Sequence, residues 1–129
     1  MAGAAIGGVV IWKMAVDRIR KLKEFLARDG EDSFSLYALA MEYASRGRFE
    51  ESLEYFDRLL RTDPEHVPGY HQKAKVLAQL GRYVQARAVL EAGVPHAQRS
   101  GQFHTRDKMA EMLRQLPTRD GEGKEGKGS

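Results

Sequence analysis

The sequence predicts an all-α protein, a short α-solenoid of antiparallel helix pairs, and three observations lead to that prediction. The chain resembles itself at an offset of 34 residues, its apolar residues recur with the period of a helix, and glycine or proline interrupts that period at intervals. Its 129 residues suit a single domain. We expect the helix pairs to stack on one another, because one pair alone cannot bury its apolar face.

The 34-residue offset is defined by pairs of residues that are identical or similar in kind. In the middle of the chain these pairs are Ala40 with Ala74, Gly47 with Gly81, Arg48 with Arg82, and Phe49 with Tyr83. Toward the N-terminus the same offset joins Ile19 with Leu53, Leu22 with Phe56, and Leu26 with Leu60. We therefore expect repeats at about 33–66 and 67–100, preceded by a helix that corresponds to the second helix of a half-repeat.

Each repeat contains the signals of two helices and a short turn. The apolar stripe of the first helix consists of Leu36, Leu39, Ala40 and Tyr43, and Gly47 ends that helix. The second stripe runs from Phe49 to Leu60, until residues 62–64 break it. The next pair is expected from about Pro68 to Leu80 and from about Tyr83 into the nineties.

Pro95 should bend or end the second helix of that pair, because proline removes a backbone donor. A turn near Ser100 and Gly101 should follow. A final amphipathic helix at about 103–116 should then cap the stack.

The two ends of the chain differ from this pattern. Residues 1–13 are apolar and glycine-rich but too short to span a bilayer, and we expect a flexible extension. Two alternatives for this segment remain: it contacts a membrane, or it is sequence upstream of a natural start at Met14. Residues 117–129 are rich in Gly, Lys and Glu and should form a disordered tail. The folded domain is therefore expected at 14–116.

The segment from Ser33 to Pro64 resembles a tetratricopeptide repeat (TPR), whose pattern places large and small residues at fixed spacing. The residues at those places are Leu36, Leu39, Ala40, Tyr43, Ser52, Phe56 and Pro64 in the first unit, and Tyr70, Lys73, Ala74, Leu77, Ala86 and Leu90 in the second. The second unit departs from the pattern at Lys73, a place that is usually apolar. The resemblance covers about 14–116 and extends to the short stand-alone bacterial TPR proteins.

This resemblance implies a right-handed superhelix whose first helices line an inner groove that binds a partner. The groove positions hold Phe34, Tyr37 and Met41 in the first repeat, and Pro68, His71 and Lys75 in the second. Arg106 is the nearest residue to a groove position in the capping helix. Family members that clamp a peptide carboxylate use Lys, Asn and Arg, and Tyr37, Met41, Gln72, Gln102 and Arg106 mostly do not reproduce that set.

The residues give no comparable indication of catalysis or of a cofactor. There is no cysteine, the four histidines lack metal-ligand spacing, and no glycine-rich phosphate loop is present. The basic run at Arg18, Arg20, Lys21 and Lys23 lacks aromatic residues for base stacking, so we do not expect nucleic-acid binding. We expect a cytoplasmic, non-enzymatic protein that binds no metal and no small-molecule cofactor.

Charge is unevenly distributed along the chain and allows two functions. Residues 31–66 hold nine acidic and four basic side chains, whereas residues 67–116 hold three acidic and eight basic ones. A protein-interaction module that binds an acidic peptide or protein with an apolar anchor is the function we expect. The alternative is structural self-association of the acidic and basic halves into a dimer or oligomer.

Overall fold

The computed structural model describes residues 2–121, and it describes side chains from Lys13 onward except that of Ala15. The helices are α1 (Ala2–Asp29), α2 (Ser33–Ser45), α3 (Phe49–Thr62), α4 (Val67–Gln79), α5 (Tyr83–Arg99) and α6 (Phe103–Gln115). They form the all-α, antiparallel arrangement that the sequence predicts. In the described part of the chain, no helix is both long and apolar enough to cross a membrane.

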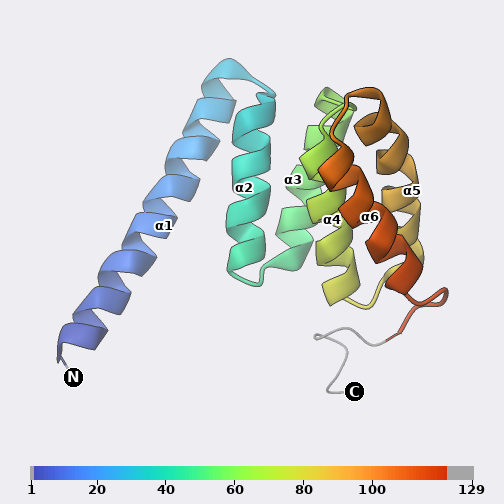
Figure 1. Cartoon of the computed structure of the whole chain (residues 1–129). Coiled ribbons are helices and arrows are strands. Elements are labelled where there is room, and N and C mark those ends of the chain that lie inside the picture. Colours follow the sequence, from blue (N-terminus) through green and yellow to red (C-terminus); the bar gives the residue numbers. More distant parts are fainter. Residues whose placement is uncertain (1, 122–129) are drawn as a thin grey trace.

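Successive helices pack against one another, and every second helix shares one side of the stack. α2 packs against α3 and α4 against α5, and α6 covers α4 and α5 (Figure 1). α1 packs against α2 in the way that α3 packs against α4, which confirms that it is the second helix of a half-repeat. Toward its N-terminus α1 diverges from α2 (Figure 1).

Three glycines end α2, α4 and α5 in the same way. Gly47, Gly81 and Gly101 have positive φ angles of 74°, 74° and 76°. Each glycine N–H donates to the carbonyl three residues earlier, and the following N–H donates to the carbonyl five residues earlier. This is the Schellman motif, which satisfies carbonyls that the helix leaves without a partner.

The N-terminus differs from the flexible extension that we expected. α1 begins at Ala2 rather than near Met14, so residues 2–13 continue the helix. No proline occurs before Pro64. A helix that is established where α1 packs on α2 can therefore extend through this segment one residue at a time, at no further nucleation cost.

α5 does not end at Pro95. It runs from Tyr83 to Arg99 with the proline inside it, and the expected turn follows at Ser100 and Gly101. α5 is therefore 17 residues long, whereas α3 has 14. The added length shifts the register, so that α6 begins 36 residues after the start of α4 rather than 34.

The core confirms the repeat register at the places where two helices approach closely. Ala40 and Ala74 are fully buried, and the buried hydroxyl of Ser52 donates to the carbonyl of Ala40 at 2.7 Å. Where α4 meets α5, a Cβ on Gly93 would lie only 2.6 Å from the Cβ of Tyr70. Small residues at these junctions therefore set the distance between the helices.

Residues 117–121 also differ from the disordered tail that we expected. The Asp120 carboxylate accepts a hydrogen bond from the N–H of Val84 at 2.9 Å, and the N–H of Gly121 donates to the carbonyl of Gly81. Arg82, the N-cap residue of α5, makes no side-chain capping bond, so Asp120 supplies the missing cap from a distant part of the sequence. The rest of the expected tail, residues 122–129, lies outside the described residues.

We expect Asp120→Ala to lower the free energy of unfolding by about 0.5–1 kcal/mol, because it removes an acceptor at a helix N-terminus. Urea unfolding would measure the change, and Thr118→Ala serves as the matched control in the same segment. Equal stability of the two variants would show that Asp120 does not act as the cap of α5.

Candidate functional site

The sequence-predicted binding residues lie mainly on the side of the stack formed by α2, α4 and α6, here called the α2–α4–α6 face. α2 lies beside α4 and α4 beside α6, although these helices are separated in sequence by α3 and α5. The face exists because each helix pair turns the chain back on itself, which places every first helix on one side.

On α2, the structure separates Phe34 from the two other predicted residues. Phe34 is 76% exposed and is the most exposed large apolar side chain among those described. Tyr37 and Met41 are half-buried and pack against the core, so they are less available than expected. Burial also raises the pKa of the Tyr37 hydroxyl.

Tyr37 is held by an aromatic contact on each of two sides. Its ring centroid lies 6.3 Å from that of Phe56 in an edge-to-face arrangement and 4.9 Å from that of His66. His66 is fixed in turn, because its Nδ1 accepts from the N–H of Gly69 at 3.1 Å and caps α4. Tyr37 is therefore a fixed platform at the edge of the face.

On α4, His71 and Lys75 lie near Lys108 of α6, and the two lysines make this part of the face positive. His71 is half-buried, and its pKa is lowered first by that burial and then by the charges of Lys75 and Lys108. Lys75 and Lys108 are themselves exposed. Sequence analysis missed Lys108, because only the packing of α6 on α4 brings it near His71.

We expect acidification to destabilise the fold through His71. Below its ordinary pKa of about 6.5 the unfolded chain binds a proton on His71, whereas the folded protein resists it, so stability falls as the pH drops below about 6.5. The exposed carboxyls with lowered pKa, Glu31, Glu65 and Glu111, lose their contribution only in a more acidic range. Urea unfolding at about pH 7.5 and about pH 5.5 would separate the two effects.

His71→Gln is the matched variant for this measurement. It should remove most of the stability difference between those two pH values while leaving the acid transition of the carboxyls in place. An unchanged pH difference in His71→Gln would assign the effect to another group.

Arg106 does not join the predicted set. Its guanidinium donates to the side-chain oxygen of Gln98 at 2.6 Å, pairs with Asp107 and lies over the ring of Phe103. It is thus held between α6 and the end of α5. The 36-residue spacing explains the difference, since it places His104, Asp107 and Glu111 at the groove positions of α6. The extra length of α5 is the signal that sequence analysis did not use.

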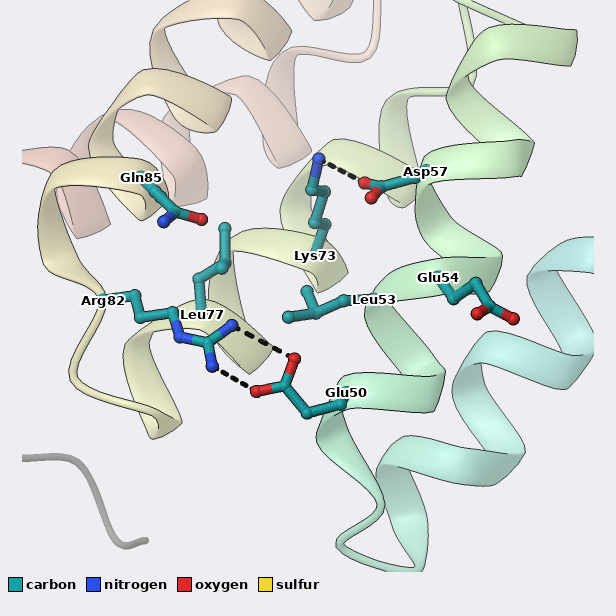
Figure 2. A pocket seen from close by; sticks show the side chains of 8 residues that line it. All are labelled: Glu50, Leu53, Glu54, Asp57, Lys73, Leu77, Arg82 and Gln85. Atoms are coloured by element: carbon teal, nitrogen blue, oxygen red, sulfur yellow. Dashed lines mark hydrogen bonds and ion pairs between the residues drawn. The ribbon is translucent and has the colours of Figure 1, made fainter. Parts of the chain in front are cut away.

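The opposite side of the stack contains a charged cleft between α3 and the second repeat, with a volume of about 300 Å³. Figure 2 shows Leu53 and Leu77 between two ion pairs, in which Lys73 reaches Asp57 and Arg82 faces Glu50. The Lys73 ammonium lies 2.7 Å from the Asp57 carboxylate. This ion pair explains why a lysine occupies a place that is usually apolar in the repeat.

His96, like His66, has structural partners. The ring of His96 stacks on that of Tyr70 at 5.2 Å, and its Nδ1 lies 2.9 Å from the carboxylate of Glu65. Among the side chains that the structure describes, no three His, Asp or Glu residues gather in a way that could hold a metal ion.

Comparison with known proteins agrees with this architecture. A family model described as tetratricopeptide repeat matches residues 43–105. A tetratricopeptide repeat and J domain-containing co-chaperone of Cryptococcus neoformans is 33% identical over 75 residues, which are 58% of this chain and 14% of that protein. An uncharacterised protein of Methanocaldococcus jannaschii is 33% identical over 58 residues, which are 45% of this chain and 67% of that protein. The chain thus spans only a small part of the co-chaperone's length.

Two solved structures share the fold. A tetratricopeptide repeat domain of Salinibacter ruber has a TM-score of 0.61 and 28% identity, covering 66% of this chain and 86% of that one. The TPR2B domain of yeast Sti1, in its pHsp70 complex, has a TM-score of 0.72 and 17% identity, covering 84% of this chain and 86% of that one. Together with the 34-residue repeat and the buried alanines at its helix junctions, these likenesses show a tetratricopeptide-repeat fold, and residues 43–105 match the model of that family.

Proposed function

We propose that this chain is an adaptor that binds a peptide or protein partner on its α2–α4–α6 face. Tetratricopeptide repeats are generally protein-interaction modules and typically have no catalytic role. The exposure of Phe34 is the observation that carries the proposal, since a partner that covers an exposed aromatic ring removes apolar area from water and gains a large share of its binding energy there. Half-buried Tyr37 and Met41 extend the apolar surface beside it.

The chemistry of the face favours a partner that combines an apolar anchor with an acidic residue. The anchor would contact Phe34 and Tyr37 on α2, and the acidic residue would lie near Lys75 and Lys108. The polypeptide partner named for the yeast domain is consistent with peptide binding on this fold. The carboxylate-clamp residues of the family are mostly missing here, so a different peptide class is proposed.

An affinity pull-down with the wild-type chain beside a Tyr37→Ala, Lys75→Glu double variant tests the proposal. We expect the double variant to lose the partner, because it removes an aromatic contact and reverses a charge on the same face. Titration of the recovered partner against Phe34→Ala, Met41→Ala and Lys75→Glu should then show weakening of roughly tenfold for the strongest anchor. Binding to Lys75→Glu should also be less sensitive to salt.

Val84→Ala is the matched control, because Val84 is another exposed large apolar side chain but lies on α5. It should leave binding unchanged. The proposal fails if Val84→Ala weakens capture as much as Phe34→Ala, or if the double variant retains the partner while remaining folded.

Self-association is not favoured by the structure's charges. The acidic and basic halves of the chain already pair with each other, through Asp57 with Lys73 and Glu50 with Arg82. The complementarity that suggested an oligomer is therefore partly satisfied within one chain. Sizing at low and high salt checks this alternative, which requires a salt-sensitive oligomer.

A further inference from the structure

The cleft in Figure 2 has a counterpart one repeat earlier, and the two differ in charge. The counterpart, here called the α1–α3 cleft, consists of two neighbouring pockets of about 340 Å³ and about 290 Å³ that share Lys23. It is lined by Val16, Ile19, Lys23, Leu26, Ala27, Tyr43, Arg46, Arg48, Glu51, Tyr55 and Arg58. Subtracting 34 from the residues of the Figure 2 cleft gives most of those that line the larger pocket, so the repeat builds that pocket. The smaller pocket, which contains Tyr55 and Arg58, has only Lys23 in common with this set.

In the Figure 2 cleft, one wall is acidic and the other wall is basic. α3 contributes Glu50, Glu54 and Asp57, and the second repeat contributes Lys73 and Arg82. The two ion pairs that cross the cleft therefore neutralise carboxylates with cations of the same chain.

In the α1–α3 cleft, α1 forms the wall that corresponds to the acidic wall of the Figure 2 cleft, and this wall is not acidic. Val16, Arg20 and Lys23 of α1 stand where α3 has Glu50, Glu54 and Asp57. Arg48, the counterpart of Arg82, remains on the facing wall and pairs with Glu51 in the first turn of α3, which also lines the cleft. Both walls therefore carry cations. α1 has no carboxylate at the positions that correspond to Glu50 and Asp57, the two α3 residues that form ion pairs in the Figure 2 cleft.

Two stacked tyrosines form the aromatic part of this cleft. The rings of Tyr43 and Tyr55 lie 5.6 Å apart at an angle of 12°. Lys23 and Arg48 lie over the Tyr43 ring at 5.5 Å and 5.2 Å, and Arg58 lies over the Tyr55 ring at 5.1 Å. The rings hold the cations in place by cation–π contacts.

This arrangement favours carboxylates over nucleic-acid bases. Tyr43 and Tyr55 are only 3% and 9% exposed, and their faces are taken up by each other and by the cations. A base would need an open ring face on which to stack. Carboxylates need only the ammonium and guanidinium groups. The side chains of Arg48 and Arg58 are 51% and 28% exposed, and their ion pairs with Glu51 and Glu31 lie at the protein surface, where such pairs contribute little stability and can exchange.

The spacing of the cations fits an extended segment. Arg48 precedes α3 and Arg58 lies in its last turns, so a helical rise of about 1.5 Å per residue separates them by roughly 15 Å. An extended peptide covers that length with about five residues. Lys23 projects from α1 into the space between them.

We propose that the α1–α3 cleft binds an acidic peptide segment in extended form, with its carboxylates on Lys23, Arg48 and Arg58. This site is separate from the α2–α4–α6 face, because it is formed by the second helices of the repeats. The segment would pair with Lys23, which stands where α3 has Asp57, and would compete with Glu51 and Glu31 for Arg48 and Arg58.

Capped hexaglutamate, titrated into the isotopically labelled full chain and followed by NMR, tests this site directly. At low salt of about 20 mM, we expect shifts at Lys23, Tyr43, Arg48, Tyr55 and Arg58 that saturate and that fade as salt is added. Shifts confined to His71, Lys75 and Lys108 would overturn this inference and leave the proposed function intact. Capped hexaglutamine should cause none of these shifts.

Lys23→Glu should weaken hexaglutamate binding by roughly fivefold or more, and Lys23→Gln by less, since charge reversal adds repulsion to the lost attraction. Lys21→Glu is the matched control, two residues away on α1 but outside the cleft, and should change affinity by less than about twofold. Circular dichroism checks that each variant remains folded.

Equal weakening by Lys21→Glu and Lys23→Glu would show only a general charge effect and would overturn the site. Saturable binding of a single-stranded oligonucleotide that is lost in Lys23→Glu, with no binding of hexaglutamate, would assign the cleft to nucleic acid instead. Absence of any saturable shift at low salt would also overturn the proposal.

Discussion

Phe56→Ala is expected to lower the free energy of unfolding by about 3–5 kcal/mol, the range for deleting a fully buried aromatic ring. The Phe56 side chain is completely buried in α3, and it contacts the ring of Tyr37 on α2. Its loss leaves a cavity between the two helices of the first repeat. A domain of this size has only about 5–15 kcal/mol of stability in total, so the variant should unfold far more readily in urea.

Phe34→Ala is the matched control, because it makes the same chemical change at a side chain that is 76% exposed. Its stability should stay within about 0.5 kcal/mol of the wild type. If Phe34→Ala proved as destabilising as Phe56→Ala, Phe34 would belong to the core and its place in the binding face would be wrong. Urea unfolding followed by circular dichroism makes the comparison.

Ala40→Leu is expected to cost about 1–3 kcal/mol by overpacking the junction between α2 and α3. Ala40 is fully buried, and its carbonyl accepts the hydroxyl of Ser52 at 2.7 Å, so three added carbons have no space without moving α3. We expect the melting temperature to fall by roughly 4–8 °C for each kcal/mol lost.

Ala38→Leu provides the control on the same helix, since Ala38 is only half-buried. It should leave the melting temperature nearly unchanged. Equal melting of Ala40→Leu and the wild type would contradict the helix junction that the 34-residue repeat places at Ala40 and Ala74.

Much of the fold could be predicted because its signals are local and repeated. Glycines 34 residues apart end helices by the same hydrogen bonds, and the stripe from Leu36 to Tyr43 is buried as its spacing indicates. The helix continues through Pro95 to the expected turn at Ser100 and Gly101, but its 17 residues exceed the 14 of α3. The two-residue shift that follows moved the groove positions of α6 away from Arg106.

The candidate site could be predicted only in part. Sequence position placed Phe34, Tyr37, His71 and Lys75 on the α2–α4–α6 face, but it could not show that Tyr37 is held by Phe56 and His66. It also could not show Lys108 near His71, or the cations around Tyr43 and Tyr55. These contacts join helices that are distant in sequence.

The sequence by itself determined the helix-pair repeat, its register through the first two repeats and the side of each helix that is buried. These properties depend on the periodicity and on the small residues of each segment alone. Tertiary structure alone decided how far each side chain is exposed, which charges pair across repeats, and that Asp120 caps α5. Exposure and pairing depend on distances between segments, and packing sets those distances only when all the helices are in place.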